Sequence, residues 1–79
     1  MQIDKEIKER ICRNVDKIIK GKWPDIDDIE ISNILSEEYT TLLSYRGFNK
    51  GKPTVSLRFL IKFSYLSETS LDDLIKKDL

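Results

Sequence analysis

The sequence has no histidine and a single cysteine among its 79 residues, and these absences exclude much of the chemistry that a small domain can perform. Cys12 has no partner for an internal disulfide, and one cysteine without a histidine cannot form a zinc site. No histidine can activate Cys12, and the chain lacks a glycine-rich phosphate loop and an isolated carboxylate pair. We therefore expect no enzyme, no metal and no cofactor, and Cys12 as a small core or edge residue of a protein from a reducing, cytoplasmic compartment.

Long apolar runs are also absent. No apolar stretch approaches the roughly 18 residues that span a membrane, and the first ten residues, MQIDKEIKER, are charged throughout, unlike a signal peptide. No repeat, linker or low-complexity tract divides the chain, so we expect one soluble domain over residues 1–79 with no membrane partner. A domain of this size buries only about 60–65% of the unfolded chain's surface, so tight helix packing or a homodimer is expected to supplement its core.

Charge is balanced in total but segregated along the chain. Lys and Arg number fourteen, as do Asp and Glu, which gives a net charge of zero. By segment, however, the charge is +3 over residues 1–22, −6 over 23–40, +5 over 41–66 and −2 over 67–79. Such segregation can produce a local field that the net value conceals, although solvated surfaces also explain it.

Apolar spacings of three and four predict five short helices. They are expected at residues 4–20 and 25–35, from Ser36 to the helix-breaking Gly47, at 55–66 and after Ser70. Gly21 is a plausible end of the first helix, and Trp23 a lid on the core. The many β-branched residues in 25–35 leave a strand open there, although we favour a helix. Ser70 and Asp73 have the spacing of a capping box.

The predicted helix at 55–66 is the most apolar segment and has two candidate faces. Phe59 and Phe63 form the second face, so the helix is either buried on most sides or exposed at a subunit contact. The residues of its first face recur in threes and fours: Leu57, Leu60, Ile61, Ser64 and Tyr65.

The stretch from Ser36 to Lys52 is the most informative for function. Ser36, Glu37 and Glu38 form a helix start signal, and the helix that follows projects hydroxyl groups from its outer face. These hydroxyl groups belong to Thr40, Thr41, Ser44 and Tyr45. Basic and amide residues stand after them, with no acidic residue from position 41 to 67, and they are Arg46, Asn49, Lys50 and Lys52. The pattern indicates a surface that faces an anion.

Two runs near the end of the chain resemble a known family. They are Pro53-Thr-Val-Ser-Leu-Arg-Phe-Leu-Ile-Lys-Phe-Ser-Tyr-Leu66 and Thr69-Ser-Leu-Asp-Asp-Leu-Ile75. They are similar to the closing half of Cro/CI-type (Xre-like) helix-turn-helix domains, in outline over residues 26–75. The resemblance implies an all-α, compact five-helix bundle of the lambda-repressor-like helix-turn-helix kind. A weaker likeness is to the amino-terminal helix-turn-helix domain of some phage anti-CRISPR autoregulators.

Matched to this family, residues 27–35 correspond to its second helix, with Ser32 where alanine is usual. Residues 40–47 correspond to its recognition helix. The sequence departs from the family in two places. The turn, Leu35-Ser-Glu-Glu, lacks the usual glycine, and the loop at residues 48–52 is slightly long. Both departures affect the register of the recognition helix more than the fold.

The resemblance implies a sequence-specific DNA-binding transcriptional regulator, a repressor from a phage or mobile element. It would bind a palindromic double-stranded operator as a homodimer. Thr40, Thr41, Ser44 and Tyr45 are then the base-facing candidates. The phosphate or groove-edge candidates are Arg46, Asn49, Lys50 and Lys52. Solvated or capping hydroxyls explain each Ser and Thr equally well on its own, and Glu37 and Glu38 count against DNA.

A protein-interaction module on the same fold is the alternative, such as an anti-CRISPR or antirepressor protein. It would use the acidic residues between Asp25 and Glu38 as a nucleic-acid mimic, or Trp23, Phe59 and Phe63 as hydrophobic anchors.

Overall fold

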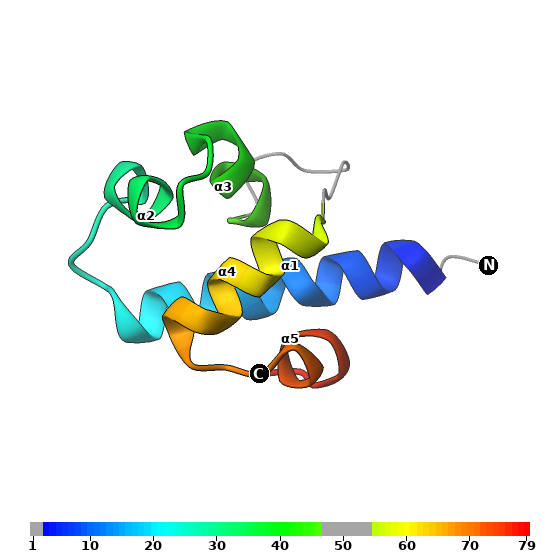
Figure 1. The fold of residues 1–79 in the computed structure, drawn as a ribbon. Helices are drawn as coiled ribbons and strands as arrows, with labels where there is room; N and C mark the ends of the chain where they lie inside the picture. The colour runs from blue at the N-terminus through cyan, green and yellow to red at the C-terminus, as the bar shows by residue number, and fades with distance from the viewer. Residues whose placement is uncertain (1–2, 47–54) are drawn as a thin grey trace.

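The computed structural model describes residues 3–46 and 55–79, and these form five α-helices. They are α1 (Ile3–Lys22), α2 (Asp28–Leu35), α3 (Tyr39–Tyr45), α4 (Leu57–Ser67) and α5 (Leu71–Lys76). In Figure 1, α1 runs along the molecule, α4 crosses in front of it, α2 and α3 lie on one side and α5 on the other. The expectation of an all-α five-helix bundle is confirmed, and the strand left open for residues 25–35 is wrong, because residues 28–35 are helical.

Helix α1 supplies one wall of the core with an unbroken apolar stripe. Ile11, Val15 and Ile19 recur every four residues and are buried, and Cys12 beside them is buried and unpaired, as expected for a small core residue. The helix continues through Gly21 to Lys22, so the predicted stop at Gly21 is wrong. Burial raises the pKa of the Cys12 thiol to about 11, which keeps the group neutral at physiological pH.

A row of aromatic rings joins the helices at the centre of the bundle. The rings of Tyr45 and Phe59 stack with centroids 3.9 Å apart, and those of Phe59 and Phe63 lie 5.9 Å apart. Trp23 closes the row edge-on to Phe63 at 6.0 Å, which confirms its predicted place as a lid on the core. Aromatic contacts of this kind stabilise a core by about 0.5–1.5 kcal/mol each beyond the burial of their area.

These rings decide which face of α4 points inward. Phe59, Leu60 and Phe63 are buried, whereas Leu57, Ile61 and Tyr65 are exposed. Both sets have helical spacing, but only the first meets the rings of Tyr45 and Trp23. Of the two alternatives left open by the sequence, burial on most sides is therefore wrong, because α4 buries one face and exposes the other. Phe59 and Phe63 are not available to a partner as hydrophobic anchors. Ser56 begins the helix by accepting a hydrogen bond from the Phe59 backbone N–H at 3.2 Å.

The buried side chain of Asn14 fastens α5 and the residues after it to α1. Its Nδ2 donates to the carbonyls of Leu74 and Lys77 at 2.8 and 2.7 Å, and its Oδ1 accepts from the Leu79 backbone N–H at 3.0 Å. Asn14 is 2% exposed, and its bond to the Leu74 carbonyl is buried, while the other two are partly buried. The Ser70 side chain caps α5 by accepting from the Asp73 N–H at 3.1 Å, as its sequence spacing predicts.

Candidate nucleic-acid interface

Helices α2 and α3 form a pair joined by a turn of three residues, 36–38, and pack against each other. The Asp27 side chain caps α2 by accepting from the Glu30 backbone N–H at 2.9 Å. Ser32 is buried in α2 and donates its hydroxyl hydrogen bond back to the Ile29 carbonyl at 2.7 Å. The hydroxyl of this buried residue is therefore satisfied within the helix.

Ser36 makes the turn by taking a left-handed backbone conformation, with φ 53° and ψ 43°. Its N–H donates to the Asn33 carbonyl at 3.1 Å, and the Glu37 N–H donates to the Ser32 carbonyl at 2.9 Å. Glycine favours this conformation because it has no Cβ, so Ser36 does here what a glycine does at the end of many helices. The prediction that Ser36 starts the third helix is wrong: it ends α2, and Glu38 occupies the N-cap position of α3.

The outer side of α3 carries polar and aromatic groups. Tyr39 and Thr40 are exposed, and Thr41, Leu43 and Ser44 are half-buried. The Ser44 hydroxyl donates to the Thr40 carbonyl at 3.3 Å, so part of its hydrogen-bonding capacity is used within the helix. Thr40, Thr41 and Ser44 therefore remain reachable from solvent on α3, and Tyr39 joins them although it was not among the predicted candidates.

Tyr45 is not part of that surface. It is 1% exposed, its ring stacks on Phe59, and its hydroxyl accepts a hydrogen bond from the Ser56 backbone N–H at 2.9 Å. Burial raises the pKa of the phenol above its usual value. The prediction that Tyr45 faces a base is thus wrong for this fold, because the aromatic core and the start of α4 require the side chain inside.

Arg46 also points inward and meets two carboxylates from other helices. Its Nε lies 2.5 Å from Asp16 Oδ1 and its Nη1 lies 2.5 Å from Asp28 Oδ1. The Arg46 side chain is only 14% exposed, so both of its charge-assisted bonds are shielded. The assignment of Arg46 to a phosphate contact is therefore corrected: in this conformation it ties α3 to α1 and α2.

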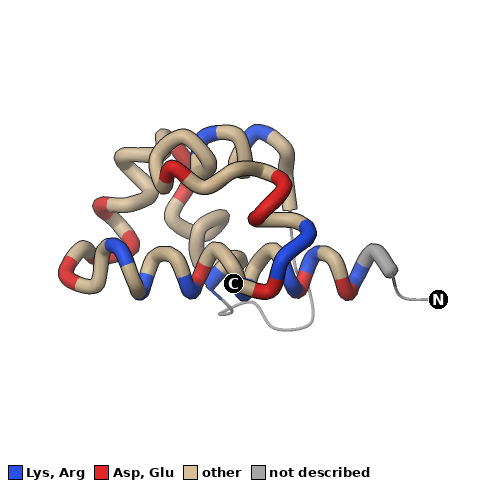
Figure 2. The backbone as a smooth tube through the Cα atoms, turned by 90° about the horizontal axis from the view of Figure 1, so that it is seen from below, with Lys and Arg blue, Asp and Glu red and all other residues tan. Residues whose placement is uncertain are grey.

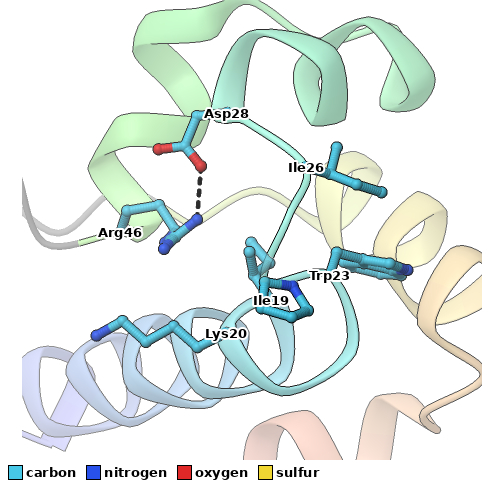
Figure 3. Close-up of a pocket in the computed structure, with 7 residues that line it drawn as sticks. Ile19, Lys20, Trp23, Ile26, Asp28 and Arg46 are labelled. Carbon is cyan, nitrogen blue, oxygen red and sulfur yellow. Dashed lines mark hydrogen bonds and ion pairs between the residues drawn. The ribbon is translucent and has the colours of Figure 1, made fainter.

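A hollow lies beside this ion pair, at the junction of α1 with the α2–α3 pair (Figure 3). Ile19, Trp23 and Ile26 form its apolar wall, and Arg46 with its bond to Asp28 closes one side. The volume is about 180 Å³, which is smaller than the roughly 300 Å³ at which small-molecule sites begin. We assign this hollow no ligand.

Partial burial acts to raise the pKa of Asp16, but hydrogen bonds from Lys20 and Arg46 outweigh it and lower the pKa below the usual value. The Lys20 ammonium lies 2.8 Å from Asp16 Oδ2, one turn along α1. Asp16 is therefore ionised throughout the neutral range and helps to hold Arg46 in place.

The charges that remain around α3 are few. Lys62 of α4 lies 3.4 Å from Glu37 and donates to the Ser36 carbonyl at 3.2 Å, so the two charges neutralise each other beside the turn. Glu38 and Arg58 are exposed. Figure 2 shows acidic and basic residues interspersed along α1. Three further candidates, Asn49, Lys50 and Lys52, lie outside the described residues.

Two interactions of this site were missed from the sequence, the Arg46 ion pairs and the Lys62–Glu37 pair. Arg46 and Asp16 are separated by 30 residues, and Lys62 and Glu37 by 25. Helical periodicity carries no signal at such separations, because it relates residues only within one turn or two. The acidic stretch 25–38 was instead treated as a single patch, although Asp28 and Glu37 are taken up by ion pairs.

Within the described residues, no helix is both long enough and apolar enough to cross a membrane, and no cluster of ligand side chains could hold a metal ion. Comparison with known proteins found no matching family model, no matching curated protein and no matching solved structure.

Proposed function

We propose that the chain is a sequence-specific DNA-binding transcriptional regulator of the helix-turn-helix type, a repressor of phage or mobile-element origin that acts as a dimer. The observation that carries the proposal is the α2–α3 pair. Its helices of eight and seven residues are joined by a three-residue turn whose first residue is left-handed, and α3 keeps hydroxyl groups at the surface. This arrangement would allow α3 to enter a major groove while α2 crosses the backbone.

Thr40, Thr41 and Ser44 are the proposed base-reading residues, now with Tyr39. Hydroxyl groups can bond to any base edge, and the methyl groups of threonine can contact a thymine methyl, so each contributes modest discrimination. Phosphate contacts fall to Lys50, Lys52 and the exposed Arg58, with Asn49 as a neutral donor, since Arg46 is already paired. Three cations per subunit give six for a dimer.

Salt dependence provides a quantitative test. Six phosphate contacts predict a slope of log affinity against log salt concentration of about −5, whereas one subunit alone predicts about −3. The operator can be selected from a pool of random duplexes and its affinity then measured by mobility shift over a series of salt concentrations. Lys52→Ala should make the dimer slope shallower by about 2, because the change removes two contacts.

Specificity is tested with a double variant and a control. The double variant Thr40→Ala with Ser44→Ala should lower affinity for the selected duplex while leaving affinity for unrelated DNA nearly unchanged. Lys76→Ala is the control, because it removes an exposed cation from α5, which packs on α1 and α4 and not on α3. Failure of the pool to yield any preferred sequence, at low salt and micromolar protein, would refute the proposal.

One observation favours the second candidate, a protein-interaction module such as an anti-CRISPR or antirepressor protein. Asp25, Asp27, Glu30 and Glu38 are exposed along the segment that contains α2. An acidic surface of this kind can mimic nucleic acid for a basic partner. This candidate predicts no selected duplex and a partner whose binding is weakened by Asp25→Asn with Glu30→Gln.

A further inference from the structure

The outer face of α4 carries a stripe of three apolar side chains, Leu57, Ile61 and Tyr65, which we call the α4 stripe. They recur every four residues and are 64%, 42% and 85% exposed. Ile34 of α2, which is 53% exposed, and Leu66 border a shallow groove of about 490 Å³ between α2 and α4, into which Ile61 and Tyr65 also project. Among the described residues, none of these side chains belongs to the core cluster or to the partly buried residues packed against it.

The stripe and its two neighbours are large for a molecule of this size. A fully exposed aromatic side chain has about 150–250 Å² of surface, and an aliphatic one has somewhat less. Multiplied by the exposed fractions of the five residues, these areas give roughly 500 Å² of exposed apolar surface. The total accessible surface of the chain is 5357 Å². The largest apolar patch on a typical monomer is about 300–600 Å² and is often functional, and this chain reaches that range with only 79 residues. A small dimer interface needs roughly 600–800 Å² per subunit with its polar rim.

The order of residues along α4 matches a second copy of the same helix. In a two-fold arrangement every residue i that meets residue j is repeated as j meeting i. If two α4 helices cross in antiparallel fashion at Ile61, then Ile61 meets Ile61 of the other copy, and Leu57 meets Tyr65 on both sides, since both lie four residues from the centre. The large Tyr65 ring of each copy thus packs against the smaller Leu57 side chain of the other copy.

The charge nearest the two-fold axis is paired within each subunit. Lys62 stands next to Ile61 and would approach its own copy near the axis. Its pairing with Glu37 at 3.4 Å neutralises that charge within each subunit.

We propose that the α4 stripe, together with Ile34 and Leu66, is the surface through which two copies of this chain form an antiparallel, two-fold symmetric dimer. The inference deepens the proposed function, because it supplies the dimer surface that binding to a palindrome requires. The dimer is nevertheless measured without DNA, so failure of the dimer and failure of the proposed function can be distinguished. A dimer that selects no duplex would contradict only the proposal of a DNA-binding regulator.

Sedimentation equilibrium over a range of concentrations gives the first test. Ile61→Asp or Tyr65→Asp should raise the dimer dissociation constant at least about 100-fold, since each places two carboxylates in an apolar contact. Ile29→Asp is the matched control: Ile29 is 56% exposed on α2 but does not border the groove, and its variant should stay within about threefold. Circular dichroism checks that all three variants remain folded.

Cross-linking tests the antiparallel register. Ile61→Cys should form a disulfide between the two copies of the chain. In a mixture of Leu57→Cys and Tyr65→Cys chains, the disulfide between the two different variants should form faster than a disulfide between two identical chains. The native Cys12 is buried, so it does not compete. Ile29→Cys is again the control, and it should cross-link no faster than expected from random collisions between chains.

The oligomeric state of the wild-type chain provides the last check. A wild-type chain that remains monomeric up to about 0.5 mM would overturn the inference. So would a dimer that tolerates Ile61→Asp, because this face would then be free of the interface.

Discussion

Helix α1 is fastened to the rest of the bundle by two different kinds of chemistry. Toward α5, the neutral amide of Asn14 makes three short hydrogen bonds to the backbone. Toward α2 and α3, the carboxylate of Asp16 holds Arg46, which also binds Asp28. The Asn14 bonds join neutral groups, whereas the Arg46 contacts join charged ones. Charged groups also meet on the α5 side, where Arg10 and Arg13 lie 3.6 Å from Asp78, but the Asp78 side chain is 75% exposed, whereas that of Arg46 is 14% exposed. The side of the molecule proposed to bind DNA is therefore the side whose docking relies on shielded ion pairs.

Replacing Asn14 should have the largest effect on stability. Asn14→Ala leaves the buried Leu74 carbonyl without its partner, together with the partly buried Lys77 carbonyl and Leu79 N–H. We expect a loss of about 3 kcal/mol in the free energy of unfolding by urea. Lys17→Ala is the control, since its exposed ammonium bonds to the Leu79 carbonyl in the same region and its loss should cost under about 0.5 kcal/mol. Similar losses for the two variants would contradict the role given to Asn14.

Replacing Arg46 should break the other attachment. Arg46→Ala leaves two partly buried carboxylates without their partner. We expect the free energy of unfolding to fall by about 2 kcal/mol. The loss is smaller than for a fully buried pair because Asp16 and Asp28 keep some contact with water. The same variant should leave the salt slope of DNA binding unchanged in protein that remains folded. Arg58→Ala should do the reverse, with little effect on urea unfolding and a shallower slope. A shallower salt slope for Arg46→Ala would contradict this account and support the original prediction that Arg46 contacts a phosphate.

Acid should weaken the ionic attachment selectively. The folded-state pKa of Asp16 is lowered below its usual value, so its contribution to stability is complete above the unfolded pKa of about 3.8 and is lost as pH falls through the folded pKa. Asp16→Asn should therefore flatten the fall in stability below about pH 4. Urea unfolding from pH 6 to pH 2 measures the difference. Equal acid slopes in the two proteins would mean that Asp16 gains nothing from Arg46 and Lys20.

The smallest effect is expected at the turn between α2 and α3. Ser36→Gly should raise the free energy of unfolding by about 0.5–1 kcal/mol, because glycine adopts the left-handed conformation without a Cβ clash. Glu68→Gly at the end of α4 is the matched comparison, since Glu68 has nearly the same backbone angles, with φ 56° and ψ 33°. A destabilising effect of Ser36→Gly would show that the serine side chain contributes something beyond the turn.

What the sequence predicts correctly is the local structure. Periodic apolar residues locate the five helices, and the Ser70 cap and the Trp23 lid follow from neighbouring residues. Ser36 was assigned to the wrong helix because serine is a common N-cap residue, whereas the structure places it at the end of α2 in a left-handed conformation that favours glycine.

The errors at the candidate site have a different origin. Tyr45 and Arg46 follow the polar residues of α3 directly, and only partners elsewhere in the chain show that they belong to the interior. On α4, two apolar sets had the same periodicity, and the choice between them depended on the aromatic rings of other elements. Tertiary contacts of this kind are not encoded in spacing.

The central claim is that α3 presents its hydroxyl face to DNA, and an NMR titration tests it most directly. Amide resonances of ¹⁵N-labelled protein would be followed as the selected duplex is added at moderate salt. The largest shifts are predicted at Tyr39, Thr40 and Ser44, with Arg46 and the α5 amides little changed. Shifts centred on the exposed lysines of α1, or none at α3, would contradict the claim.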